Sequence, residues 1–161
     1  MAQQPSKPTA RVFLVVVDES PEMRKALYYA CRRAKRTGGR VAMLYVMAPP
    51  EAQQWGSVAD LMRQEARQQA EEIVAQHAET AASLTGQPPT IHIREGKPRD
   101  ELLKLIAEDH SISVLVLGSA SSGEGPGPLV TSFAGKGASQ LRIPLTIVPG
   151  VLTEAEIDEI S

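Results

Sequence analysis

The stretch VFLVVVD, residues 12–18, is an apolar, largely β-branched run that ends on a carboxylate. It does not alternate with polar residues, which is typical of a strand covered on both faces. Residues 20–22, Ser-Pro-Glu, come next, and Ser at the N-cap with Pro at the first helical position favours a helix start. Apolar residues then recur at helical spacing over residues 23–34, before a Gly-Gly pair. A buried strand followed by an amphipathic helix begins a βαβ unit.

The rest of the chain repeats this alternation. We expect further strands at residues 41–46, 90–94, 113–117 and 145–148, and further helices at residues 57–86, 98–109 and 129–141. Strands that alternate with helices require right-handed crossovers and a mainly parallel sheet. The predicted fold class is therefore α/β, with a doubly wound, open, five-stranded, mainly parallel sheet and helices on both faces.

One domain accounts for most of the 161 residues, which is the length of a single ordinary domain. We expect the α/β domain over residues 11–150, preceded by a flexible N-terminal tail at residues 1–10. Residues 151–161 are predicted to form a short acidic C-terminal helix, because Thr153 and Glu156 have the spacing of a capping box.

Charge and composition exclude several classes of function. Lys and Arg total 17 against 19 Asp and Glu, a net charge of −2, so no basic field attracts nucleic acid or an anionic membrane. The longest apolar runs, residues 12–17 and 41–48, fall far short of the roughly 20 residues that span a bilayer. A single cysteine, Cys31, allows neither an intrachain disulfide nor a cysteine-based zinc site. We expect a cytoplasmic protein that binds neither nucleic acid nor membrane.

The loops after the first and fourth strands are the predicted ligand site. In open α/β sheets, ligands lie outside the carboxyl ends of the strands where the strand order reverses. Asp18 ends the first strand, and the loop at residues 118–128, GSASSGEGPGP, leads from the fourth strand into a helix. Glycine N–H groups and a helix start favour phosphate, and the carboxylate suits a ribose hydroxyl. The alternative is that Asp18 caps the first helix and the loop only turns the chain.

Motifs of common catalysts are missing. The turn at residues 18–21, DESP, lacks the Rossmann glycines, and residues 135–137, GKG, lack the rest of a P-loop. The loop serines do not fit a nucleophile elbow, and the three histidines lack metal-ligand spacing. No catalytic residue and no metal ligand is therefore predicted. Cys31 lies on the apolar stripe of its helix, which favours a small buried hydrophobe over a reactive thiol.

Several short motifs together resemble the universal stress protein family, over roughly residues 12–148. They are Val-Val-Asp at 16–18 with Ser20, Leu-Tyr-Val at 44–46, Glu-Gly-Lys-Pro at 95–98, Leu-Val-Leu-Gly-Ser at 115–119 and Ile-Pro-Leu-Thr-Ile-Val at 143–148. Members that bind ATP carry a Gly, two residues, a second Gly, nine residues, and then Gly with Ser or Thr. Gly118 and Ser132 keep the first and last positions, whereas Ser121 and Thr131 replace the second and third glycines.

Two readings of this altered motif stay open. Glycines 123, 125 and 127 rebuild the phosphate cradle in another shape, or phosphate binding has been lost or changed. Glu124 would oppose a triphosphate unless it points away or meets a metal, and Lys136 could offset it. The resemblance implies that Asp18 contacts the ribose. The complete set of cofactor-binding residues that it implies is Val17, Asp18, Val46, Gly118, Ser119, Ser121, Thr131, Ser132 and Phe133.

The resemblance implies a small stress-response protein that binds ATP or another adenine nucleotide, with Mg, as a sensor or adaptor. It also implies a homodimer through the last strand, Leu145 to Val148, whose exposed edge has a physical reason to pair. Any ATP hydrolysis should be slow, because no general base or arginine finger can be named opposite the loop. The alternative is a nucleotide-free module of the same fold whose Gly-Pro loop and acidic tail contact a protein partner.

Overall fold

The computed structural model describes residues 9–50 and 56–161, so most of the predicted tail at residues 1–10 lies outside the described residues. The elements in chain order are β1 (Val12–Val16), α1 (Pro21–Thr37), β2 (Arg40–Met47), α2 (Gly56–Thr85), β3 (Thr90–Glu95), α3 (Pro98–Glu108), β4 (Val114–Ser119), α4 (Pro128–Ala134), the 3-10 helix η1 (Lys136–Gln140), β5 (Leu145–Pro149) and α5 (Glu154–Ile160). Among these, no helix combines the length and the apolar composition needed to cross a membrane.

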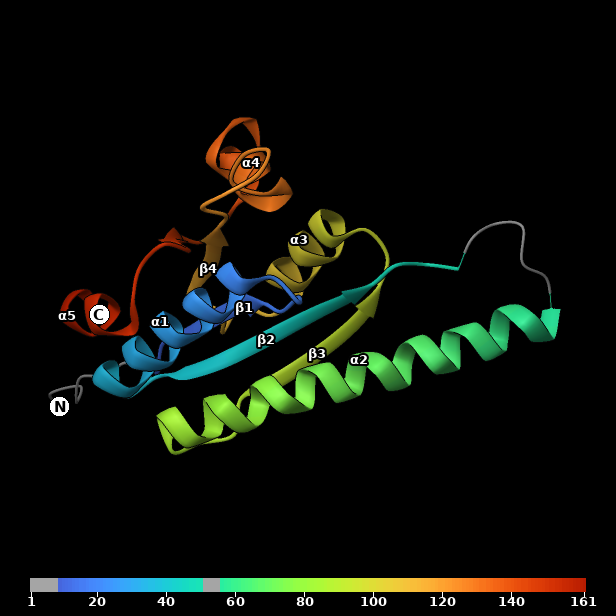
Figure 1. Ribbon diagram of the computed structural model, residues 1–161, viewed down its shortest axis with the longest axis horizontal. Coiled ribbons are helices and arrows are strands. Elements are labelled where there is room, and N and C mark those ends of the chain that lie inside the picture. The colour runs from blue at the N-terminus through green and yellow to red at the C-terminus, as the bar shows by residue number, and fades with distance from the viewer. Residues whose placement is uncertain (1–8, 51–55) are drawn as a thin grey trace, which may run out of the picture.

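The five strands form one sheet in the order β3-β2-β1-β4-β5, and every neighbouring pair is parallel. This confirms the predicted α/β fold class. β1 is the central strand. The strand order reverses between β1 and β4, because the chain first adds β2 and β3 on one side of β1 and later adds β4 and β5 on the other. The outer strands are β3 and β5, and Figure 1 shows β3 beside β2.

Helices cover both faces of the sheet, which explains the unbroken apolar run that begins the fold. Phe13 and Val15 of β1 pack with α1 and α2 in one core. Val12 and Leu14 point to the other face and pack with α3 and α4 in a second core. Because successive side chains of a strand face opposite sides, a strand buried on both sides has apolar residues at each position.

Local signals fix the ends of α1 as the sequence predicts. The Oγ of Ser20 accepts a hydrogen bond from the N–H of Met23 at 3.3 Å, and Pro21 takes the first helical position. At the other end Gly38 has a φ of 70°, a left-handed conformation that favours glycine, and its N–H donates to the carbonyl of Ala34.

The helix expected at residues 129–141 is shorter than predicted. The α-helix α4 ends at Ala134, and the chain continues as the 3-10 helix η1. Glycines at 135 and 137 weaken the helix because they lose more backbone entropy than other residues. A Cβ on Gly137 would lie 2.6 Å from the carbonyl oxygen of Ser132, so η1 folds back tightly on α4.

The predicted C-terminal helix is present as α5, with both hydrogen bonds of the Thr153–Glu156 capping box. It packs on α1 (Figure 1), where Ile157 is fully buried and Asp158 accepts a hydrogen bond from the hydroxyl of Tyr28 at 2.8 Å. The Nε of Arg32 lies 2.9 Å from the same carboxylate. Part of the basic face of α1 is therefore occupied by the acidic C-terminal segment.

Candidate functional site

A cavity of about 480 Å³ opens where β1, β2 and β4 end, at the point where the strand order reverses. We call it the main cavity. Its walls are mostly apolar, with Val16, Val46, Leu117 and Leu129 among the residues that line it. This is the place where doubly wound sheets hold ligands, and the volume lies in the range of small-molecule sites, about 300–1,000 Å³.

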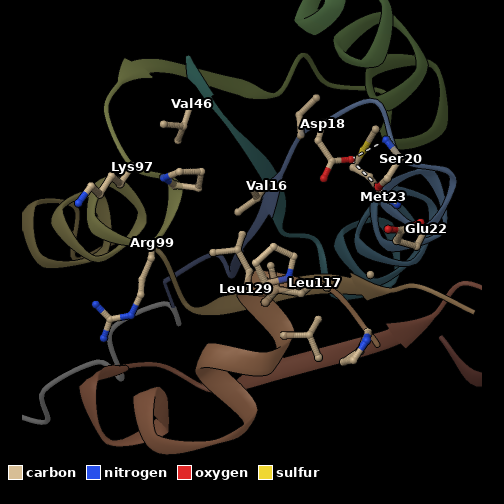
Figure 2. Close-up of a pocket in the computed structure, with 17 residues that line it drawn as sticks. Val16, Asp18, Ser20, Glu22, Met23, Val46, Lys97, Arg99, Leu117 and Leu129 are labelled. Atoms are coloured by element: carbon tan, nitrogen blue, oxygen red, sulfur yellow. Dashed lines mark hydrogen bonds between the residues drawn. The ribbon is translucent and has the colours of Figure 1, made fainter. Parts of the chain in front are cut away.

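One side of the main cavity is acidic. Asp18, Ser20 and Glu22, from the end of β1 and the first turn of α1, line that side (Figure 2). Asp18 Oδ1 accepts hydrogen bonds from the N–H of Ser20 at 2.8 Å and from its hydroxyl at 2.5 Å. Oδ2 has no hydrogen-bond partner among the described residues. The carboxylate therefore supports the start of α1 with one oxygen and leaves the other for a ligand, so the two readings of Asp18 are compatible.

Lys97 and Arg99, at the start of α3, line the opposite side of the main cavity, and their charged ends extend away from Asp18, toward the rim (Figure 2). Neither residue is among the site residues that the sequence predicts, although residues 95–98 form one of the motifs of the family resemblance. The available signal was that β3 is parallel to β1, so the turn after it reaches the same edge of the sheet. The cavity thus has a carboxylate side and a cationic side, with apolar walls between them.

Arg99 also borders a second, smaller cavity of about 330 Å³, which we call the side cavity. Its Nε donates to Ser132 Oγ at 3.0 Å, and its Nη2 contacts Gln140 Oε1. The guanidinium carbon lies 5.9 Å from the centre of the Phe133 ring. Arg99 therefore joins α3 to α4 and η1, and separates the two cavities.

The structure brings together only part of the predicted cofactor-binding set. Val17, Asp18, Val46 and Gly118 line the main cavity, whereas Ser119 and Ser121 do not. Thr131 and Ser132 line the side cavity, since α4 already begins at Pro128 and they lie within the helix. Phe133 is 1% exposed and belongs to the second core.

The Gly-rich loop after β4 folds back on itself. The N–H of Ala120 donates to the carbonyl of Pro126 at 2.9 Å, which closes the loop, and the three loop glycines 123, 125 and 127 have positive φ. Its last residues, Pro126 and Gly127, line the main cavity together with Pro128 of α4. Glu124 is exposed and does not line the cavity.

None of the groups with a shifted pKa, among the described residues, lines the main cavity. Burial raises the pKa of the Cys31 thiol to about 12, which agrees with the prediction of a buried hydrophobe. Burial, followed by the charges of Glu19 and Asp18, raises the pKa of Tyr45. Burial lowers the pKa of His77 and of His92. Among residues 9–50 and 56–161, no cluster of three His, Cys, Asp or Glu residues could hold a metal ion.

Fold and cavity together define a class: a small, doubly wound α/β protein with a ligand-sized cavity at the reversal of its strand order. The model of the Universal stress protein family matches residues 9–149, almost the whole chain. The chain therefore belongs to the universal stress protein family. Comparison with curated proteins gives no significant match.

Solved structures share the fold at low sequence identity. Universal stress protein UspA from Lactobacillus plantarum has a TM-score of 0.70 at 16% identity, over 88% of this chain and 99% of that one. A universal stress protein family member from Burkholderia pseudomallei has a TM-score of 0.65 at 16% identity, over 89% and 98%. A universal stress protein in complex with cAMP has a TM-score of 0.57 at 16% identity, over 89% and 99%.

Proposed function

We propose that this protein is a cytoplasmic stress-response protein that binds ATP or another adenine nucleotide in the main cavity and acts as a sensor or adaptor. The observation that carries the proposal is the cavity itself, with the Asp18 carboxylate on one side and Lys97 and Arg99 on the other. A nucleotide has a largely apolar base, ribose hydroxyls and anionic phosphates. These three parts match the apolar walls, the carboxylate side and the cationic side of the cavity. The related structure in complex with cAMP supports the choice of an adenine nucleotide.

Binding rather than turnover is the proposed activity. Among the described residues that line the main cavity, Asp18 and Glu22 are the acidic ones, and both lie on the side opposite the cations. A base near the ribose side is badly placed to activate water at a terminal phosphate, and phosphoryl transfer needs the nucleophile positioned in line. We expect ATP hydrolysis to be slow at most, and Mg to assist binding only through the phosphates.

The matched test of nucleotide binding compares Asp18→Asn with Asp109→Asn. Asp109 accepts from the N–H of Ser111 at 3.0 Å and from its hydroxyl at 2.5 Å, which repeats the local geometry of Asp18 and Ser20 away from the cavity. Asn keeps the oxygen that accepts these hydrogen bonds but removes the charge. We expect Asp18→Asn to weaken the binding of AMP about tenfold or more, because it loses a charge-assisted hydrogen bond to a ribose hydroxyl.

Calorimetric titration of ligand-stripped protein with adenosine, AMP, ADP and ATP measures this effect. Asp109→Asn should bind like the unmodified protein. Equal losses in the two variants would show that the effect of Asp18→Asn does not depend on its place at the cavity. If folded, unmodified protein binds none of these ligands, the nucleotide proposal fails and the nucleotide-free interaction module takes its place.

We also propose that the protein forms a homodimer through β5, the strand expected to pair at residues 145–148. β5 is an outer strand with one unpaired edge in the described sheet, and Ile147 is 37% exposed on it. An apolar edge strand is a template for pairing with a second copy.

Replacing Ile147 by Lys should dissociate the dimer. The paired edges would bury the lysine of one copy beside the same lysine of the other, and like charges across an interface repel. We expect the dimer dissociation constant to rise about 100-fold, as measured by sedimentation equilibrium. Ile91→Lys is the control, because Ile91 is 44% exposed on β3, the outer strand at the other edge. A dimer that survives Ile147→Lys but not Ile91→Lys would place the interface on β3.

A further inference from the structure

The Gly-rich loop offers few hydrogen-bond donors to the phosphates of a ligand in the main cavity. Where the loop enters α4, residues 126–130 line the cavity. Two of these residues are prolines, which have no N–H, so the backbone donors of this segment are those of Gly127, Leu129 and Val130. The N–H of Ala120 already donates to Pro126. The three amides of residues 127, 129 and 130 carry no full positive charge, so the charge of a di- or triphosphate needs cationic side chains from elsewhere.

The charges of the main cavity direct phosphates away from α1. The carboxylates of Asp18 and Glu22 lie on one side and would repel a phosphate, whereas Lys97 and Arg99 lie on the other (Figure 2). A nucleotide whose ribose hydroxyls meet Asp18 thus has its phosphate end toward α3, at Arg99.

Beyond Arg99 lies the side cavity, whose six lining residues are Arg99, Thr131, Ser132, Lys136, Gly137 and Gln140. Two of these are cations, two carry hydroxyls, and none of the described lining residues is acidic. Asp100 approaches Arg99 Nη1 at 3.6 Å, but its side chain is 51% exposed and it does not line the cavity. At about 30 Å³ per water molecule, the cavity of about 330 Å³ has room for phosphate groups with some of their water.

The side chain of Arg99 is already held in place for such a role. Its contacts with Ser132, Gln140 and the Phe133 ring fix the guanidinium between the two cavities. A planar guanidinium with five donors can keep some of these contacts and still bind a phosphate oxygen. Lys136, at the start of η1, adds a flexible point charge farther along the same cavity.

We propose that the phosphates of the bound nucleotide pass Arg99 into the side cavity, where Arg99 and Lys136 bind them and favour di- and triphosphates over AMP. This inference rests on the proposed function. It places the phosphates at the junction of α3, α4 and η1 and not in the Gly-rich loop.

The test is calorimetric titration with adenosine, AMP, ADP and ATP in EDTA, so that no metal neutralises the phosphates. We expect Lys136→Met to weaken ADP and ATP about tenfold while adenosine and AMP change less than about twofold, because one charge-assisted contact is lost. Arg99→Met should weaken every phosphorylated ligand more than adenosine, and Arg99→Lys should recover part of the loss. Lys104→Met removes a cation from α3 outside both cavities and should change nothing.

Arg99→Met removes contacts to α4, so the unfolding curve of this variant is measured as well. If Arg99→Met is unstable, the test rests on Lys136→Met. The inference is overturned if ATP loses no more affinity than adenosine in either variant. In that case adenosine binding that still depends on Asp18 would leave the proposed function intact. Failure of adenosine and all three nucleotides to bind the unmodified protein would overturn both.

Discussion

Phe133→Ala is expected to lower the free energy of unfolding by about 3–5 kcal/mol, the usual cost of removing a buried aromatic side chain. Phe133 is 1% exposed and packs in the second core with Leu102, Leu105 and Val130. α4 has only seven residues, of which Phe133 and Val130 are buried, so the ring supplies much of the contact that holds it. Since whole domains are stable by about 5–15 kcal/mol, this loss is a large part of the total.

Urea unfolding followed by circular dichroism measures the change. Phe133→Leu is the control, because it refills most of the space and should cost far less than the alanine variant. The family resemblance places Phe133 near the nucleotide, and a ring that mainly touched ligand would give the opposite pattern, with lost affinity and unchanged stability. Any loss of affinity that we expect in Phe133→Ala comes through Arg99, which stacks over this ring.

Gly118→Ala is expected to destabilise the protein by about 3 kcal/mol, the upper part of the usual range for overpacking. A Cβ at this position would lie 2.2 Å from the carbonyl oxygen of Glu22 and 2.6 Å from its carbonyl carbon. Both are backbone atoms, so no side chain can rotate away, and the first turn of α1 must move off β4. For a chain of this size the melting temperature should fall by about 10 °C.

Gly123→Ala is the matched control for this second prediction. Gly123 has a φ of 98°, so alanine is strained there, but a Cβ would meet nothing within 4 Å. We expect its cost to be about 1 kcal/mol. If the two variants have the same melting temperature, the packing of α1 against β4 is looser than the structure indicates. A Gly118 variant that lost affinity at full stability would instead support its role as a phosphate-loop glycine.

The sequence predicts the fold because its signals are local. The apolar run at 12–17 marks a doubly covered strand, Ser20 and Pro21 mark the start of α1, and the Thr153–Glu156 pair marks the cap of α5. Each signal depends on residues within a few positions of one another, where backbone propensity and the periodicity of apolar residues determine the secondary structure directly. The helix expected over 129–141 was interrupted where two glycines lowered its propensity and the chain turned back on α4.

Asp18 shows what the sequence determined about the site by itself. A carboxylate at the end of the central strand must lie at the carboxyl edge of a parallel sheet, so its place follows from the fold class. The same holds for Val46 and Gly118, each of which is the last residue but one of its strand. These three residues could be placed beside the cavity without knowing how the helices pack.

Only the tertiary structure decided which side chains meet Asp18 across the cavity. Arg99 is 81 residues away in the chain, and its position depends on how α3 leaves β3 and packs against α4. The direction of α4 turned Thr131 and Ser132 toward the side cavity and Phe133 into the core. Sequence periodicity reports the burial of single elements, whereas the angle between elements depends on packing between distant residues. The turn after β3 could therefore be placed at this edge of the sheet from the sequence, but the position of Lys97 and Arg99 opposite Asp18 followed only from the folded chain.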